Sequence, residues 1–350
     1  MHKILCIGEE WRGSNSSGLF YALSRIGHQI ELVNELNYIS LNGKSFQSKF
    51  FNKLIRYPQI KDFNEQIIEK AKQVKPDIIF IYKGAFIFPE TLKTLKMEGH
   101  LLINFYPDVS LFTHGSYIPK CIPLYDHIFT TKSFAIRDLK NKFNYENVTF
   151  IPHGYDPSLH NIDKLQKQSL FSCDVSFIGT WSPKKERILS HIANYIPELN
   201  MKIWGNQWQK CTTSSLASAI QGVALFGDQY VEAIQHSKIN LGILSEVRKG
   251  ASSGDLITSR TFHIPASGGF MLHEKTDEVL LYFKEGLEFV SYVDIYDLID
   301  KIIYYLKQSE ERELVAKMGL KRAQNDHSLD QRALEIINIL KNITNIKSEY

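Results

Sequence analysis

Short apolar runs recur along the whole chain and alternate with longer stretches of helical period. Each run is rich in β-branched or aromatic side chains and lacks the polar alternation of a half-exposed strand. Such runs, separated by helical stretches, predict parallel sheets covered by helices on both faces. The predicted strands are residues 4–7, 30–33, 78–82, 101–104, 127–130 and 148–151 in the first half, and 175–178, 201–204, 223–226, 239–244, 269–272 and 289–293 in the second.

A segment rich in proline, glycine and aspartate, residues 151–157, separates the two halves and is the best linker candidate. A chain of 350 residues is long for one core, so two doubly wound α/β domains are expected. We predict an amino-terminal domain over 1–153, a second domain over 154–329 and a final helix over 330–350. The other predicted helices are residues 17–26, 63–74, 186–196, 231–236, 276–283 and 298–306.

Composition narrows the function classes. The hydrophobic fraction of 43% is that of a folded protein, and a net charge of +3 is too weak to indicate nucleic-acid binding. Cys6, Cys121, Cys173 and Cys211 are widely spaced and form no metal-binding or disulfide pattern. With no apolar run of 18 or more residues, we expect a cytoplasmic protein, at most peripheral to the membrane.

The loop after the first predicted strand, residues 8–18, is rich in glycine and serine. Gly13 would let a ligand approach the backbone, and the following helix would present free amides to an anion. The loop has neither a dinucleotide-binding glycine pattern nor a P-loop lysine. A plain turn in which Ser16 or Ser17 is the helix N-cap explains it equally well.

A second glycine loop, Gly179 and Thr180, opens the second domain and leads into a helix predicted to begin at a Ser182 cap. Lys184 and Lys185 then lie in the first helical turn, where positive charge opposes the helix dipole. A bound phosphate would remove that cost, so the pair indicates a phosphate site. The alternative is that both side chains extend into solvent.

The densest group of polar residues lies within 254–270. Interpreted as one helix, the segment places Asp255 and His263 close to one face, with Arg260 on a neighbouring face. The preceding small-residue loop, 250–254, has amides that could hold a diphosphate. The alternative is a surface helix with Asp255 as its N-cap and His263 as an incidental polar residue.

These segments, taken in order, resemble the carboxy-terminal half of GT-B fold glycosyltransferases, most closely the spore-maturation (CgeB-type) glycosyltransferase-like family. The matching blocks are residues 175–187, 203–208 and 257–274, and residues 151–157 are similar to the interdomain hinge of retaining enzymes. The resemblance implies an α/β GT-B fold, with two Rossmann-like domains facing across a cleft and a carboxy-terminal helix that crosses back to the first domain.

The resemblance also implies roles for individual residues. Retaining members carry Glu-x7-Glu, and the corresponding positions here are Asp255 and His263. Asp108 resembles an amino-terminal-domain aspartate of the family, and His114 lies close to it in the sequence. We expect catalytic roles for Asp255, Asp108 and His114, the last two toward the acceptor hydroxyl or the donor sugar. The expected donor-binding residues are Gly13, Gly179, Thr180, Lys184, Lys185, Arg260, His263, Ser267, Gly268 and Gly269.

The expected reaction transfers a sugar from a nucleotide-diphosphate sugar to a glycan, lipid-linked or small-molecule acceptor, with retention. The sequence contains no Asp-x-Asp, so we expect no metal and no cofactor; lysine, arginine and helix amides would stabilise the leaving diphosphate. The alternatives are a nucleotide-sugar epimerase, a phosphorylase, or a non-catalytic spore-coat-like or assembly protein. The basic, aromatic segment 44–56 would either contact anionic lipid or supply ordinary core.

Overall fold

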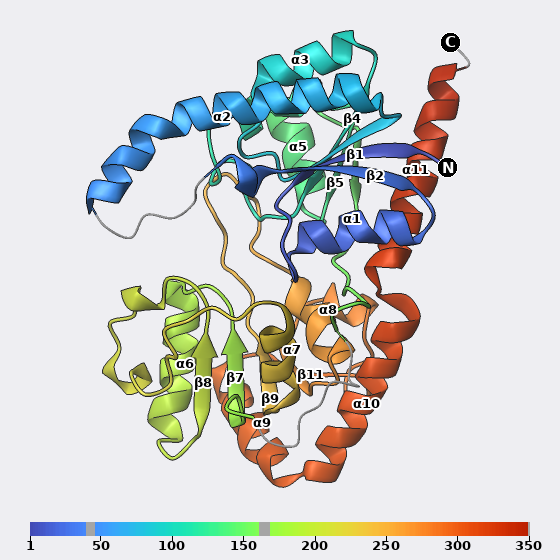
Figure 1. Cartoon of the computed structure of the whole chain (residues 1–350). Helices are drawn as coiled ribbons and strands as arrows, with labels where there is room; N and C mark the ends of the chain where they lie inside the picture. Colours follow the sequence, from blue (N-terminus) through green and yellow to red (C-terminus); the bar gives the residue numbers. More distant parts are fainter. Residues whose placement is uncertain (40–45, 161–168, 349–350) are drawn as a thin grey trace. The chain divides into compact units, whose positions relative to one another are not determined.

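The computed structural model describes residues 1–39, 46–160 and 169–348, without the side chains of 46–55 and 344–348 (Figure 1). The chain divides into two compact units. Unit 1 contains Met1–Pro152, Val247–Ser253 and Arg332–Tyr350, and unit 2 contains His153–Glu246 and Gly254–Gln331. The first unit is therefore built from three separate pieces of the chain.

Unit 1 contains a six-stranded parallel sheet with strand order β2-β1-β3-β4-β5-β6. All six strands predicted for the first half of the sequence are confirmed. The side chains of β1, β3, β4 and β5 are mostly buried, whereas those of the edge strands β2 and β6 are mostly half-buried. Helices cover the sheet, with α1 (Asn15–Arg25) on one face and α2 (Phe46–Val74) and α3 (Pro89–Met97) on the other (Figure 1). The strands are β1 (Lys3–Gly8), β2 (Gln29–Asn34), β3 (Ile78–Tyr82), β4 (Leu101–Tyr106), β5 (His127–Thr130) and β6 (Val148–Phe150).

Three helices of unit 1 were not predicted, at Pro89–Met97, Ile118–Cys121 and Ala135–Phe143, and the predicted helices differ from the structure at their ends. Helix α1 is capped by Ser14, whose hydroxyl accepts from the amide of Ser17, so the predicted cap at Ser16 or Ser17 is wrong. Helix α2 begins at Phe46 rather than near residue 63 and continues through Pro58. The helices are α1 (Asn15–Arg25), α2 (Phe46–Val74), α3 (Pro89–Met97), α4 (Ile118–Cys121), α5 (Ala135–Phe143) and α11 (Leu329–Ser348), with 3-10 turns at Glu35–Asn37 and Ile122–Leu124.

Unit 2 contains a five-stranded parallel sheet with strand order β11-β10-β9-β7-β8. Five of the six strands predicted for this half are confirmed, and the one at 223–226 is wrong. Val223 and Phe226 are both exposed there, and the segment leads into α7 instead of pairing along a strand. The strands are β7 (Cys173–Ile178), β8 (Met201–Trp204), β9 (Ser237–Gly242), β10 (Met271–Glu274) and β11 (Val290–Tyr292).

Two features of unit 2 differ from the predicted helices. Residues 276–283 form only the short 3-10 turn Val279–Leu281, whereas α10 was not predicted at all. Helix α10 buries only Val315, Gly319 and Ala323, so it shows no clear apolar period. The helices are α6 (Pro183–Tyr195), α7 (Gly227–Gln235), α8 (Ser259–Ala266), α9 (Ile295–Lys307) and α10 (Ser309–Asp326), with further 3-10 turns at Trp208–Lys210 and Ser214–Leu216.

Candidate functional site

Charged side chains gather at the carboxyl edge of the unit 1 sheet. Glu9 follows β1, Glu35 follows β2, Lys83 follows β3 and Asp108 lies just beyond β4. Parallel strands end at the same edge of a sheet, which brings these four residues into one region. Of these four, only Asp108 is among the predicted site residues, although Lys83 directly follows a predicted strand and Glu9 and Glu35 each lie two residues beyond one. The strand-end rule, applied to every strand, would have found them.

Asp108 is held between two basic side chains. The ammonium nitrogen of Lys83 lies 2.9 Å from Asp108 Oδ2, and His114 Nε2 lies 3.3 Å from the same oxygen. Burial alone would raise the pKa of Asp108, but the charges of Lys83 and His114 outweigh it and lower the pKa. The Asp108 carboxylate is therefore ionised at neutral pH. The structure thus brings together two of the predicted catalytic residues, Asp108 and His114.

The His114 imidazole is suited to accept a proton. Burial lowers its pKa, and the opposing charge of Asp108 does not offset this, so the ring is neutral at pH 7. With Nε2 facing the Asp108 carboxylate, the pairing favours a proton on Nε2 and leaves Nδ1 as an acceptor. A neutral imidazole fixed by a carboxylate can bind a sugar hydroxyl or take its proton.

Lys83 is fixed by an unusual backbone turn. Its φ is 64°, in the left-handed region that non-glycine residues rarely adopt, and Gly84 follows with a φ of 79°. The Lys83 amide donates to the Phe105 carbonyl at 2.8 Å, and the Asn104 side chain donates to the Lys83 carbonyl at 3.3 Å. These bonds hold the turn that places the ammonium group beside Asp108.

The charged edge borders a cavity of about 520 Å³ within unit 1. Glu9, Glu35, Lys83 and His114 all line it. Glu35 is only 8% exposed, and burial, followed by the negative charge of Glu9, raises its pKa to about 7. A carboxyl group that titrates near neutral pH beside a cavity is typical of a functional site.

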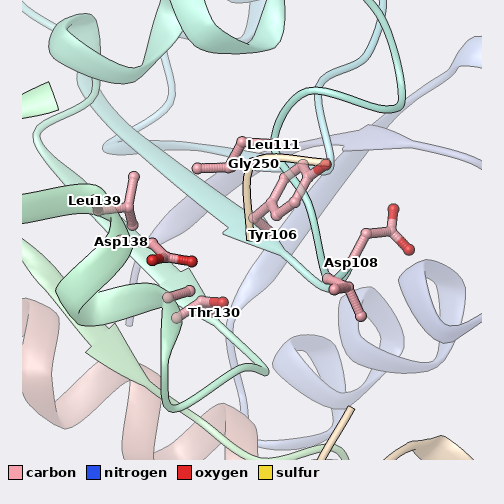
Figure 2. Close-up of a pocket in the computed structure, with 9 residues that line it drawn as sticks. Tyr106, Asp108, Leu111, Thr130, Asp138, Leu139 and Gly250 are labelled. Carbon is pink, nitrogen blue, oxygen red and sulfur yellow. The ribbon is translucent and has the colours of Figure 1, made fainter. Parts of the chain in front are cut away.

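A second, much smaller pocket lies on the other side of Asp108 (Figure 2). Its volume of about 10 Å³ has room for a single water molecule, so it cannot hold a sugar. Figure 2 shows the Asp108 carboxylate pointing away from Asp138, which lines the same pocket. Asp138 instead accepts from the Ser252 amide at 2.9 Å. The functional side of Asp108 is therefore the side that carries Lys83 and His114.

The segment Val247–Ser253 is anchored within unit 1. Besides the Asp138 bond, Ser110 Oγ donates to the Lys249 carbonyl and the Lys142 ammonium donates to the Gly250 carbonyl. The amides of residues 250–254 were expected to hold a diphosphate. The Ser252 amide is already engaged, so the predicted use of this loop as a continuous amide cradle is not supported.

The two lysines at the start of α6 have partners inside unit 2. Lys184 bonds to both carboxylate oxygens of Glu274, at 2.7 and 2.8 Å. Lys185 donates to the Thr180 carbonyl at 3.1 Å and to Ser245 Oγ at 3.2 Å. The helix begins, as predicted, at a Ser182 cap. The Glu274 carboxylate compensates the Lys184 charge, and Lys185 donates to protein oxygens, so their position does not require a phosphate. Phosphate binding here stays a prediction.

Arg260 ties two strand ends together. Its guanidinium donates to the carbonyls of Ile178, at 3.3 Å, and Ile243, at 2.8 Å, and lies over the Phe177 ring. A Cβ on Gly179 would lie 2.8 Å from the Arg260 guanidinium. Gly179 therefore makes room for Arg260. Gly13 has a φ of 98° and serves the turn before α1. For all three residues the donor contact stays a prediction.

The predicted helix from Asp255 to His263 is wrong. Helix α8 begins at Ser259, and Thr258 is its N-cap in a reciprocal capping box with Thr261. Asp255 precedes the helix, and its amide donates to the Ser245 carbonyl at 2.9 Å. The capping box is the stronger start signal, so Asp255 is neither a helical residue nor the N-cap.

His263 lies in the interior of unit 2. Its Nε2 is 3.2 Å from the Gly154 carbonyl, and its ring centroid is 4.3 Å from that of His160. Burial lowers the pKa of both imidazoles. A ribose contact by His263, expected from the resemblance, would compete with these contacts and stays a prediction.

The glycine pair after α8 closes the helix. The Gly268 amide donates to the Pro265 carbonyl at 2.9 Å and the Gly269 amide to the Ile264 carbonyl at 3.0 Å. Gly268 has a φ of 78°, which completes a Schellman-type end, and Ser267 is the C-cap. Both glycine amides are engaged, and the carboxyl end of a helix repels an anion. The expected phosphate contact through these amides is therefore not supported.

Residues 1–39, 46–160 and 169–348 contain no group of three histidine, cysteine, aspartate or glutamate side chains arranged to hold a metal ion. Within the same described ranges, no helix has the length and apolar character needed to cross a membrane. The segment predicted to contact lipid, 44–56, falls outside the described side chains except for Arg56.

Comparison with known proteins adds a family match and a fold. Residues 184–338 match the family described as glycosyl transferase-like. No curated protein matches the sequence. The structure is similar to that of a sucrose-phosphate synthase from Thermosynechococcus elongatus, with a TM-score of 0.62 and 11% sequence identity. The similarity covers 99% of this chain and 100% of the synthase chain.

Two further solved structures have the same fold. One is Anabaena HepE in complex with UDP-glucose, with a TM-score of 0.63, 13% identity, and coverage of 98% of this chain and 100% of the other. The other is a UDP-GlcNAc 2-epimerase from Neisseria meningitidis bound to UDP-GlcNAc, with a TM-score of 0.53, 12% identity, and coverage of 97% and 100%. At such low identity the likeness shows the fold alone, and it confirms the predicted GT-B arrangement of two Rossmann-like domains. The family match and this fold together support a glycosyltransferase family of the GT-B type.

Proposed function

We propose that the protein transfers a sugar from a nucleotide-diphosphate sugar to a hydroxyl group of a glycan, lipid-linked or small-molecule acceptor. The observation that carries this proposal is the glycosyl transferase-like match over residues 184–338. Anabaena HepE, which has the same fold, binds UDP-glucose. The charged edge of unit 1, where Asp108 and His114 meet beside a cavity, supplies chemistry that such a reaction needs.

In the proposed reaction the bond between the sugar anomeric carbon and the diphosphate oxygen breaks, and a bond to the acceptor oxygen forms. The acceptor hydroxyl loses its proton, and the nucleoside diphosphate leaves. We assign His114 to bind a hydroxyl of the reacting sugars through Nδ1. Asp108 orients the His114 ring, and Lys83 keeps Asp108 ionised.

The stereochemistry depends on which group takes the acceptor proton. The resemblance to retaining enzymes predicts retention, in which an oxygen of the leaving phosphate takes the proton on the same face of the sugar. The His114–Asp108 pair favours the other course, in which His114 takes the proton and direct displacement inverts the anomeric centre. Proton NMR of the first-formed product distinguishes the two: retention would support the prediction from the resemblance, and inversion would assign His114 as the general base.

The test of the reaction class uses the full chain and a panel of UDP-, GDP-, ADP- and dTDP-sugars. We expect one donor to bind by calorimetry and to be slowly hydrolysed without an acceptor. Asp108→Asn should reduce turnover by about 100-fold, because the imidazole loses its charged partner. Excess EDTA should leave turnover unchanged, since we propose a metal-independent reaction. Failure of every nucleotide sugar to bind would refute the proposal and favour a non-catalytic protein.

A further inference from the structure

The segment Val247–Ser253, which we call the strap, lies between two stretches of unit 2 in the sequence but belongs to unit 1. Its two ends are joined within unit 2, where the Asp255 amide donates to the Ser245 carbonyl at 2.9 Å. Ser182 Oγ donates to the Glu246 carboxylate at 2.9 Å and so holds the same closing point to the start of α6. The strap is therefore a loop that is closed at its base in unit 2, while its own residues pack in unit 1.

Ser110 joins the strap to the loop that follows β4. It is buried, and its hydroxyl donates to the Lys249 carbonyl of the strap while accepting from the Phe112 amide at 3.1 Å. The Ser110 carbonyl accepts from the Tyr106 hydroxyl at 2.7 Å and from the Thr113 hydroxyl at 3.2 Å. Ser110 thus fixes the chain around it, and the strap supplies the acceptor for its hydroxyl.

The loop that Ser110 fixes carries both members of the Asp108–His114 pair. Asp108 precedes Ser110 in this loop, and His114 follows it. The pair depends on the 3.3 Å approach of His114 Nε2 to Asp108 Oδ2, and hence on the conformation of the chain between them. Because the hydrogen bonds of Ser110 set that conformation, losing its bond to the strap would move one member of the pair relative to the other.

The strap also brings a positive charge to His114. Burial lowers the pKa of His114, the charge of Asp108 opposes this, and the charges of Lys83 and Arg248 lower the pKa further. Arg248 belongs to the strap, so the strap acts on the imidazole by its charge as well as through Ser110. A neutral imidazole is the form that can accept a hydroxyl proton. The strap therefore favours the form of His114 that the proposed reaction uses.

The middle of the strap fits closely into unit 1. Gly250 has a φ of 78°, and a Cβ at this position would overlap the Phe112 ring. The Lys142 ammonium donates to the Gly250 carbonyl, and the Ser252 amide donates to the Asp138 carboxylate at 2.9 Å. Gly250 also borders the water-sized pocket beside Asp138 (Figure 2). These contacts hold the strap in place independently of its bond to Ser110.

We propose that the strap is a positioning element for sugar transfer: through Ser110 it holds the loop in which Asp108 orients His114, and through Arg248 it keeps the imidazole neutral. The inference rests on the proposed function and makes the reacting pair depend on a loop whose base is fixed in unit 2. Ser110 and Arg248 are then positioning residues, because each acts through the Asp108–His114 pair.

The first experiment follows the titration of His114 by proton NMR of the full chain, without any nucleotide sugar. The His114 signal is assigned by its absence from the spectrum of His114→Gln. Arg248→Gln should raise the pKa of His114, because it removes a positive charge that the strap supplies. Lys249→Gln is the matched control: it removes the same charge from the next, exposed residue of the strap and should leave the titration unchanged. Equal titration of Arg248→Gln and wild type would overturn the role of Arg248.

The second experiment displaces the strap with Gly250→Ala, whose Cβ would overlap the Phe112 ring. We expect a higher pKa of His114 and, with a donor that wild type uses, a kcat lower by about 10- to 100-fold at a donor KM within about 2-fold, because the strap acts on the reacting pair. Gly99→Ala is the matched control, since Gly99 also lies in unit 1, has a φ of 86° and has open space around it. It should bring comparable backbone strain and change neither the titration nor the kinetics.

Ser110→Ala removes only the hydroxyl that bonds to the strap, so it tests the same idea if Gly250→Ala does not fold. It should change the titration and kcat in the same directions. An unchanged His114 titration in a folded Gly250→Ala or Ser110→Ala protein would overturn the proposal, and so would a raised donor KM at an unchanged kcat. If no nucleotide sugar binds, the proposed function is refuted, while the titration still decides whether the strap positions the pair.

Discussion

Replacing Glu35 by glutamine should stabilise the protein relative to wild type as the pH rises from 5 to 8. The pKa of Glu35 is raised from 4.5 to about 7 in the folded chain. Between those two values the folded chain keeps a proton that the unfolded chain has released, so the wild-type free energy of unfolding falls as the pH rises. The difference of about 2.5 in pKa, at about 1.4 kcal/mol for each pH unit, corresponds to a loss of about 3 kcal/mol by pH 8.

Glutamine does not titrate, so the variant escapes this loss. Any pH-independent effect of the buried amide cancels when the difference between variant and wild type at pH 8 is compared with that at pH 5. Because wild type has already lost about 0.8 kcal/mol at pH 5, urea unfolding should show the variant gaining about 2.5 kcal/mol relative to wild type between pH 5 and pH 8. Glu31→Gln, at the surface, should show no comparable change. A relative stability of Glu35→Gln that does not change between pH 5 and 8 would refute the interpretation of Glu35 as an acid whose pKa burial raises in the folded chain.

Three further perturbations test the packing of unit 2. The Glu186 carboxylate accepts hydrogen bonds from the amide and the hydroxyl of Thr213, at 3.1 and 2.7 Å. Glu186→Gln should therefore lower the free energy of unfolding, measured by urea unfolding at pH 7, by about 2–4 kcal/mol. An unchanged free energy of unfolding would contradict this. Burial lowers the pKa of His160 to about 4, so folded wild type resists protonation and loses stability as the pH falls from 6.5 to 4. His160→Phe should reduce that acid loss by about 3 kcal/mol, and an unchanged pH profile would show that His160 does not cause it. Gly205 has a φ of 138°, and a Cβ there would lie 2.1 Å from the Gly179 carbonyl oxygen. Gly205→Ala should cost about 2 kcal/mol or more by thermal unfolding, and an unshifted midpoint would contradict this backbone packing.

The strands of both sheets could be predicted because burial on both faces leaves a pattern within each strand's own sequence. Strands buried on both faces require continuous apolar runs, and these runs stand out against the polar segments between them. The exception, 223–226, has the composition of a strand, and the Gly205 amide just beyond edge strand β8 donates to the Val223 carbonyl, but Val223 and Phe226 are exposed and the segment turns into α7. An apolar, β-branched composition is therefore not sufficient for a strand, because pairing also depends on contacts with other segments of the chain.

The candidate site could be predicted only in part. Asp108 and His114 lie six positions apart in one loop, so their association is nearly local. The pairing of Lys83 with Asp108 depends on the order of β3 and β4 in the sheet. The predictions that backbone amides would bind phosphate are not supported, for another reason. The amides of Ser252, Gly268 and Gly269 bond to protein groups, and the sequence pattern alone does not show which donors are already engaged.

The discontinuity of unit 1 has a consequence for the order in which the protein forms. Its sheet is complete once residue 152 has been made, and the α/β pattern up to that point resembles a self-sufficient domain. Yet the unit also includes Val247–Ser253 and the chain from Arg332 onward. During synthesis, Asp138 and Ser110 lack these partners until residues 249–252 have emerged, and unit 1 is complete only when the chain from Arg332 onward has left the ribosome. Unit 2, although later in the sequence, has all its residues available sooner than unit 1 does.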